Sequence, residues 1–150
     1  MKEEDLMGDY AIRAQFELSC PPQQLKAWLD GPTAIAGWWS DKVEGAASAV
    51  GDTFRVTFPT SPVVFELEVQ SISEDVLEWF VAQNPPWWKG TTIGFELSPA
   101  NGNGARMLFS HSGFDSDDPI IPVITPAWVR FLDNLVAVAE SGRANPAVVN

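Results

Sequence analysis

Short stretches of alternating apolar and polar residues recur along most of the chain, a pattern typical of half-buried β-strands. The first stretch runs from Tyr10 to Leu18. Five more follow between residues 53 and 111. Their apolar-side members are Phe54, Val56 and Phe58; Phe65, Leu67 and Val69; Leu77, Trp79 and Val81; Ile93, Phe95 and Leu97; and Met107, Phe109 and His111. One-sided strands in succession predict an antiparallel sheet with one covered face.

Helical spacing replaces this alternation at three places. Cys20-Pro21-Pro22 opens a short helix, and a second helical turn is predicted over residues 33–39. A long helix is predicted near the C-terminus, with Thr125 as its N-cap, Pro126 at its first position and Gly142 as its terminator. Its apolar stripe, which should cover the inner face of the sheet, consists of Trp128, Phe131, Leu132, Leu135, Val138 and Ala139.

The predicted order is one strand, two short helices, about six more strands and one long helix. This order predicts an α+β fold in which a curved antiparallel sheet wraps around the last helix. With 150 residues, the chain has the size of one domain. We expect a single domain over residues 1–150, with its core at about 10–143 and loose termini. A hollow is expected where the sheet bends away from the helix.

Charge and cysteine content narrow the function classes. Nine Lys and Arg against 20 Asp and Glu give a net charge of −11, which argues against nucleic acid and anionic membranes as partners. The single cysteine, Cys20, allows no intrachain disulfide and no zinc site built from cysteine pairs. We therefore expect a cytoplasmic protein without a cofactor or a metal. Asp115, Asp117 and Asp118 match no complete calcium loop, and a solvated loop is favoured.

Seven tryptophans are more than a plain core of this size needs, and they favour an aromatic-lined cavity. Of the adjacent pair Trp38 and Trp39, one is expected in the core and the other at the mouth of the cavity. Trp87 and Trp88 follow two prolines in a loop. These two rings have three alternatives: to cap the cavity, to make a dimer contact, or to fold back on the core. The last two are preferred for Trp87.

His111, the only histidine, is expected on the inner face of its strand. It is a candidate polar anchor or general base in the cavity, because histidine titrates near neutral pH. The alternative, which we favour, is a buried histidine bonded to the backbone or to a tryptophan, because no nucleophile or acidic partner is identifiable beside it. The full set of predicted ligand-binding residues is Trp39, Phe65, Trp79, Phe95, His111, Phe114, Trp128 and Phe131.

Several scattered segments carry a resemblance to a known superfamily. They are Cys20-Pro21-Pro22, Gly37-Trp38-Trp39-Ser40, Val50-Gly51-Asp52-Thr53-Phe54, Trp88-Lys89-Gly90-Thr91, Ile93-Gly94-Phe95-Glu96-Leu97, Phe109-Ser110-His111-Ser112-Gly113-Phe114 and Glu140-Ser141-Gly142. Together they resemble the START-like (SRPBCC) superfamily, in the branch named for the heat-shock protein 90 ATPase activator homologue. The resemblance implies the helix-grip fold, with about seven strands around the last helix. Members of the superfamily bind lipids, sterols, polyketides or plant hormones, and some are cyclases or hydrolases.

Three functions remain open at this point. The first is a module that binds a small apolar or aromatic ligand in a hydrophobic cavity. The second is a cavity enzyme, a cyclase or hydrolase of small aromatic compounds, that uses His111. The third is a protein-interaction module, including a homodimer. The absence of a recognisable catalytic set favours the first function over an enzyme.

Overall fold

The computed structural model describes residues 8–146. The predicted loose ends at 1–7 and 147–150 lie outside these residues. The strands are β1 (Tyr10–Leu18), β2 (Lys42–Gly45), β3 (Thr53–Thr57), β4 (Val64–Ile72), β5 (Val76–Phe80), β6 (Thr92–Pro99) and β7 (Ala105–Phe114). The helices are α1 (Pro22–Lys26), α2 (Pro32–Ile35) and α3 (Ile121–Ser141), with a 3-10 turn, η2 (Pro86–Trp88).

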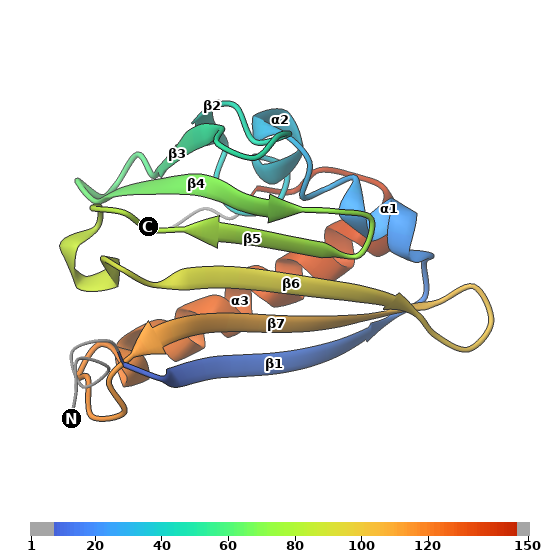
Figure 1. Ribbon diagram of the computed structural model, residues 1–150. Helices are drawn as coiled ribbons and strands as arrows, with labels where there is room; N and C mark the ends of the chain where they lie inside the picture. Colours follow the sequence, from blue (N-terminus) through green and yellow to red (C-terminus); the bar gives the residue numbers. More distant parts are fainter. Residues whose placement is uncertain (1–7, 147–150) are drawn as a thin grey trace.

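The seven strands form one antiparallel sheet in the order β1-β7-β6-β5-β4-β3-β2. Figure 1 shows α3 lying across one face of this curved sheet, with α2 beside β2 and α1 beside the C-terminal half of α3. The predicted α+β helix-grip fold is confirmed. The sequence did not locate β2, because its four residues include only one apolar side chain, Val43.

Alternation separates the two faces of the sheet. On β7, Met107 and Phe109 point to α3 and are buried, whereas Arg106 and Leu108, which alternate with them, are exposed. The outer face carries two cross-strand ion pairs, Arg55–Glu66 at 3.7 Å and Arg106–Glu17 at 2.8 Å. A turn at residues 101–104, with the sequence Asn-Gly-Asn-Gly that favours hairpins, joins β6 to β7. The period of two residues therefore decides correctly which face each strand residue occupies.

Helix α3 begins earlier than the sequence predicted. Its first residue is Ile121, so Thr125 is an interior residue whose hydroxyl donates to the Ile121 carbonyl at 2.6 Å. Pro126 also lies inside the helix, and Pro122 occupies the early position that suits proline. The end is as predicted, because Gly142 caps the helix in the left-handed region, at φ 74°. Thr125 and Pro126 resemble a helix start, but tertiary packing adds one more turn before them.

The buried stripe of α3 faces the sheet. Its members are Ile124, Trp128, Leu132, Leu135, Val138 and Ala139. By length and composition, α3 is apolar enough to cross a membrane. That test is also passed by core helices, and the sheet covers the stripe here. Helix α3 is therefore the core helix of this fold.

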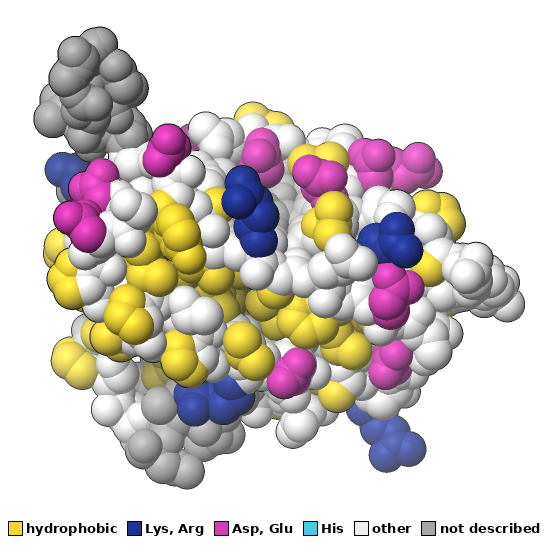
Figure 2. Space-filling model, turned by 90° about the horizontal axis from the view of Figure 1, so that it is seen from below, with side chains coloured by type: hydrophobic (Ala, Val, Ile, Leu, Met, Phe, Trp, Pro, Cys, Tyr) yellow, Lys and Arg dark blue, Asp and Glu magenta, His cyan; other side chains and the backbone are white. Residues whose placement is uncertain are grey.

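Some apolar side chains remain on the surface or are only partly buried. Seen from the side of β1, apolar side chains gather in a band across the middle of the molecule, and acidic side chains are more frequent above this band (Figure 2). Two aromatic residues that the sequence places fully between sheet and helix, Phe65 and Phe131, are only half-buried. Asn145, in the predicted loose tail, is held instead: its N–H donates to the Gly37 carbonyl at 2.7 Å.

Candidate functional site

An apolar pocket of about 180 Å³ lies between α3 and one end of the sheet's inner face. Its walls come from the segment after α2, from β4, from the η2 segment and from the first half of α3. The lining residues are Trp39, Phe65, Trp87, Trp88, Val123, Ile124, Ala127, Trp128 and Phe131. None of them carries a formal charge, and six are aromatic. The pocket therefore offers its occupant almost only carbon surface.

Trp39 is the centre of the aromatic wall. Its ring centroid lies 5.4 Å from that of Trp128, 5.9 Å from that of Phe65 and 6.3 Å from that of Phe131. Behind it, Trp79 stacks at 6.2 Å with an interplanar angle of 12°. These separations fall in the range in which aromatic rings attract each other. The wall is thus a continuous cluster, whose members support one another.

The sequence predicts that one of Trp38 and Trp39 lies in the core and the other at the mouth of the cavity. In the structure the two rings also contact each other. Trp39 lines the pocket, whereas Trp38 is buried and donates its indole N–H to the Trp28 carbonyl at 2.7 Å. The two rings nevertheless stack, 5.8 Å apart and at 14°. Gly37 permits this turn, because a Cβ there would lie 2.5 Å from the Trp28 ring. One ring therefore supports the other from the core side.

The η2 segment supplies the opposite wall and is tied to β4. The Glu66 N–H donates to the Asn84 carbonyl at 3.0 Å, and the Asn84 side chain donates to the Glu66 carboxylate at 2.6 Å. The Trp88 ring then stacks on Trp128, with centroids 5.7 Å apart and an angle of 13°. Trp87 stays at the rim, 39% exposed, with its edge against Phe65 and Trp88. Of the alternatives for Trp88, the structure places it in the pocket wall.

His111 connects these walls from behind. The Trp128 indole N–H donates to Nδ1 of His111 at 3.0 Å, so the proton of the neutral ring is on Nε2. Nε2 lies 2.8 Å from the Thr91 hydroxyl oxygen and donates to it. The Thr91 hydroxyl in turn donates to the Trp88 carbonyl at 2.6 Å. This chain of hydrogen bonds joins α3, β7 and the η2 segment.

The environment of His111 keeps its ring neutral. The side chain has no solvent exposure, and burial lowers its pKa from 6.5 to about 3. Desolvation disfavours the charged imidazolium, and no acidic group compensates for it. Both ring nitrogens are engaged by protein groups, which leaves neither free to take a proton from a bound molecule. His111 therefore holds the Trp128 ring by a direct hydrogen bond and the Trp88 backbone through the Thr91 hydroxyl.

The structure brings together half of the predicted ligand-binding residues. Trp39, Phe65, Trp128 and Phe131 line the pocket, whereas Trp79, Phe95, His111 and Phe114 lie behind its walls. All four of the latter are buried, with ring contacts to the lining or to each other. Alternation along a strand shows that a residue points inward. It does not show whether the residue ends in the packed middle of the sheet or at the open end.

Five lining residues are absent from the predicted ligand-binding set: Trp87, Trp88, Val123, Ile124 and Ala127. Trp87 and Trp88 lie in the η2 segment and Ala127 follows the predicted helix start at Thr125, whereas Val123 and Ile124 lie in the turn that precedes it. Pro122, at the second helical position, is the signal that would have included Val123 and Ile124.

Three buried indole N–H groups, those of Trp39, Trp79 and Trp88, have no acceptor among the described residues. Buried N–H groups are rarely left without a partner, because desolvation of an unpaired donor is costly. Two of these three indoles belong to rings that line the pocket. Unsatisfied donors thus concentrate at the pocket, in walls that are otherwise carbon.

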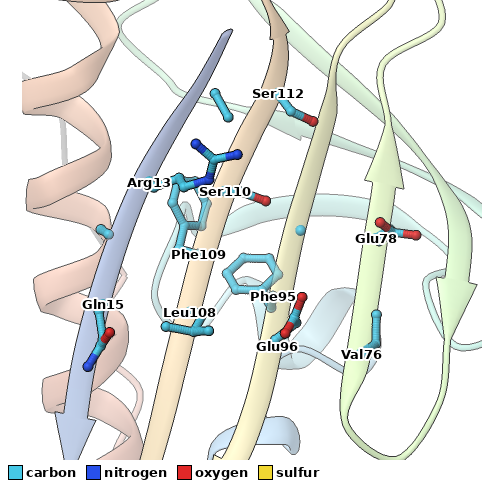
Figure 3. Close-up of a pocket in the computed structure, with 13 residues that line it drawn as sticks. Arg13, Gln15, Val76, Glu78, Phe95, Glu96, Leu108, Phe109, Ser110 and Ser112 are labelled. Carbon is cyan, nitrogen blue, oxygen red and sulfur yellow. The ribbon is translucent and has the colours of Figure 1, made fainter. Parts of the chain in front are cut away.

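A second, larger hollow of about 560 Å³ lies on the other face of the same sheet. Figure 3 shows it spread over four strands, with Arg13 reaching from β1 toward Ser110 on β7 and with Glu78 and Glu96 on the far side. Gly94 forms its floor, since a Cβ there would lie 3.1 Å from the Ser110 hydroxyl oxygen. A glycine inside an alternating strand marks such an open place, and this signal was not used in the sequence analysis.

The outer hollow is lined by a mixture of apolar residues and of polar or charged ones, among them Arg13, Glu78 and Glu96. Among residues 8–146, Arg13, Glu78 and Glu96 form no ion pair. Ligand sites are usually concave and mostly apolar with a few converging polar groups. The outer hollow lacks this character, and the inner pocket has it. The inner pocket is therefore the candidate site.

The acidic loop after β7 shows a structural use. The Asp118 carboxylate accepts the Ile120 N–H at 2.9 Å, immediately before α3. In the part of the chain that the structure describes, no three His, Cys, Asp or Glu residues are grouped so that they could hold a metal ion.

Comparison with known proteins identifies a family. The family model described as "Activator of Hsp90 ATPase homolog 1-like protein" matches residues 18–140. No curated protein matches the sequence.

Many solved structures share the fold. The solution structure of the Aha1 dimer from Colwellia psychrerythraea is 23% identical, with a TM-score of 0.77, covering 89% of this chain and 98% of that one. A Mesorhizobium loti crystal structure is 23% identical, with a TM-score of 0.74 and coverages of 88% and 98%. DynU16, from the dynemicin biosynthetic locus, is 19% identical with a TM-score of 0.72, covering 91% of this chain and 49% of that one. Identities this low show a common fold.

Proposed function

The chain belongs to the Activator of Hsp90 ATPase homolog 1-like family, and we propose that it binds a small apolar or aromatic molecule in the pocket beside α3. One observation carries the proposal: a pocket of about 180 Å³ is walled by six aromatic rings and three aliphatic side chains from four separate segments. For scale, an engineered apolar cavity of about 150 Å³ in another protein stays dry and binds benzene. The pocket therefore suits one aromatic ring or a short aliphatic group.

The unsatisfied indoles narrow the ligand class. Trp39 and Trp88 line the pocket and carry buried N–H groups without an acceptor among the described residues. These nitrogen atoms are themselves buried and the pocket surface is almost wholly carbon, so a ligand with one acceptor oxygen, such as an aryl ketone, pairs with one of them only if that ring turns toward the pocket. We therefore propose a single-ring ligand that carries one carbonyl, ether or phenolic oxygen.

The test compares two probes of nearly equal shape, ethylbenzene and acetophenone. Indole emission reports binding, because several rings of the wall change environment together. The expected result is saturable binding of both probes, with acetophenone the tighter. If ethylbenzene binds as tightly, the acceptor oxygen is irrelevant and only the apolar pocket stands. If neither probe binds, the binding function falls.

A matched pair of variants locates the binding site. Ala127 lines the pocket on α3, and Ala137 is exposed on the same helix. Ala127→Leu places three extra carbons in the pocket and should abolish probe binding. Ala137→Leu makes the same change in helix propensity and should leave binding intact. Equal probe binding by both variants would place the probe elsewhere.

The enzymatic alternative finds less support in the geometry. A general base must come within hydrogen-bonding reach of the proton that it takes, and both nitrogens of His111 are held by Trp128 and Thr91. His111→Gln should therefore keep most of the probe affinity. An activity on small aromatic compounds that is lost in this variant would restore the enzymatic function.

We also propose that the chain self-associates as a homodimer. The similar Colwellia psychrerythraea structure is described as a dimer, and this chain exposes a long edge strand, β1, beside incompletely covered apolar residues. Sedimentation equilibrium in the micromolar range should give twice the chain mass of 16.4 kDa. A mass of one chain at every concentration would contradict this. A cytoplasmic location also stays a proposal; it is supported by the single, buried Cys20.

A further inference from the structure

The two edges of the sheet are built differently. β2, at one edge, has four residues and ends at Gly45, whose φ of 114° turns the chain away. β1, at the other edge, has nine residues, and from Ala11 to Leu18 it pairs with β7 without a break. Monomeric proteins usually protect an edge by shortening it or by placing proline, lysine or a bulge in it. Within residues 11–18, β1 contains no proline, lysine or bulge.

The apolar layer under β1 is incomplete. Ala14 and Phe16 point to the inner face but are only half-buried, whereas Met107 and Phe109, on the adjacent β7, are buried. On the helix side, Val129 is 46% exposed. Helical periodicity places Val129 and Val136 on one stripe with Glu140, and Glu140 accepts the Ser19 N–H at 2.8 Å, just after β1. Figure 2 views the molecule from the side of β1, and apolar side chains form a band across that face.

The charged side chains of β1 are arranged so that two antiparallel copies of the strand would place opposite charges across from each other. Its outward side chains include Arg13, Gln15 and Glu17, in that order. Arg55 and Arg106, also on the outer face, each have an acidic partner, whereas Arg13 has none among the described residues. If a second β1 lies antiparallel with Gln15 opposite Gln15, each Arg13 faces Glu17 of the partner subunit. Opposite charges directly across a strand pair attract.

We infer that β1 pairs antiparallel with β1 of a second copy, about a two-fold axis at Gln15. This inference rests on the proposed self-association and names its surface. The two seven-stranded sheets then form one continuous sheet of fourteen strands. On the inner side, Ala14 faces Phe16 of the partner subunit, so a small side chain meets a large one twice. The pairing satisfies the free backbone groups of the edge and covers the half-buried apolar residues.

Charge variants test the pairing by sedimentation equilibrium. Arg13→Glu places like charges opposite each other at two symmetric positions and should raise the dimer dissociation constant at least about tenfold. The double variant Arg13→Glu/Glu17→Lys restores both cross-strand pairs but breaks the Arg106–Glu17 ion pair within each chain, so it should recover part of the affinity. Arg55→Glu makes the same charge change on β3, and Trp87→Ser removes the exposed ring at the pocket rim. Both should leave the dissociation constant unchanged.

A symmetric crosslink tests the register. Gln15→Cys should form a disulfide-linked dimer under mild oxidation, because the two residues 15 face each other across the axis. Gln70→Cys, an equally exposed change on β4, should not. The native Cys20 is buried, and this burial raises the pKa of its thiol, so it does not compete. A monomeric protein overturns both the dimer and this pairing. A wild-type dimer that resists Arg13→Glu, or that fails to crosslink at residue 15, overturns the β1 pairing alone.

Discussion

The two hollows lie on opposite faces of one sheet, and their origins differ. The outer hollow is local: it exists because Gly94 has no side chain between Ser110 and Glu78 on the neighbouring strands. The inner pocket is assembled from residues far apart in the sequence, such as Trp39, Phe65 and Trp128. A single substitution at Gly94 changes the floor of the outer hollow directly. The inner pocket depends on how helix, sheet and loop pack together.

This difference explains why the smaller hollow is the better binding site. The outer one has about three times the volume, but water solvates the charged groups around it. Apolar groups gain free energy on leaving water in proportion to the area buried, and the inner pocket surrounds its occupant with rings. The wholly apolar lining of the inner pocket, more than volume, distinguishes the two.

The largest expected loss of stability follows from a substitution in the wall of the inner pocket. Trp128→Ala removes a buried ring that contacts Trp39 and Trp88 and leaves Nδ1 of His111 without its donor. We expect a loss of about 3–5 kcal/mol in the free energy of unfolding, measured by urea denaturation. Glu96→Ala, at the outer hollow, should change it by less than about 0.5 kcal/mol. Similar losses in both variants would remove the distinction between the two sides.

A smaller decrease in the free energy of unfolding is expected at acidic pH. Burial holds the pKa of His111 at about 3 in the folded state, against 6.5 ordinarily. Below pH 6.5 the unfolded chain therefore takes up a proton that the folded chain refuses, and stability falls as the pH falls. Between pH 7.5 and 5 the expected loss is about 2 kcal/mol.

His111→Gln isolates this contribution, because the carboxylates titrate equally in both proteins. Glutamine can also accept from Trp128 and donate to Thr91. The variant should lack the part of the pH dependence that His111 causes, as determined from denaturation curves at several pH values. Parallel pH profiles for the two proteins would mean that His111 is not buried as a neutral ring.

The smallest effect is expected at the floor of the outer hollow. Gly94 does not have a positive φ, so alanine fits its backbone conformation and reduces the freedom of the unfolded chain. The new Cβ would lie 3.1 Å from the rotatable hydroxyl of Ser110. We expect Gly94→Ala to stabilise the protein by about 0.5 kcal/mol in thermal unfolding, with probe binding unchanged. A loss of probe binding would show that the two hollows are coupled through the sheet.

Much of this structure could be predicted because the signals are local. The alternation along β4 and β7 placed Leu67 and Phe109 on the inner face, and Gly142 ended α3 where expected. The start of α3 could not be predicted, because Thr125 and Pro126 are good starting residues whose preference was overridden by packing of the preceding turn. Val123 and Ile124 were consequently missing from the predicted site.

The sequence by itself determined the order of the elements, the face on which each strand residue lies and the abundance of rings inside. These properties follow from the periods of two and 3.6 residues, which act over a few positions. Only the tertiary structure decided that Trp39 and Phe131 border an opening, whereas Trp79 and His111 are enclosed behind it. Whether an inward-facing residue borders the pocket or lies behind its wall depends on contacts between segments that are distant in sequence. No local period of the sequence encodes those contacts.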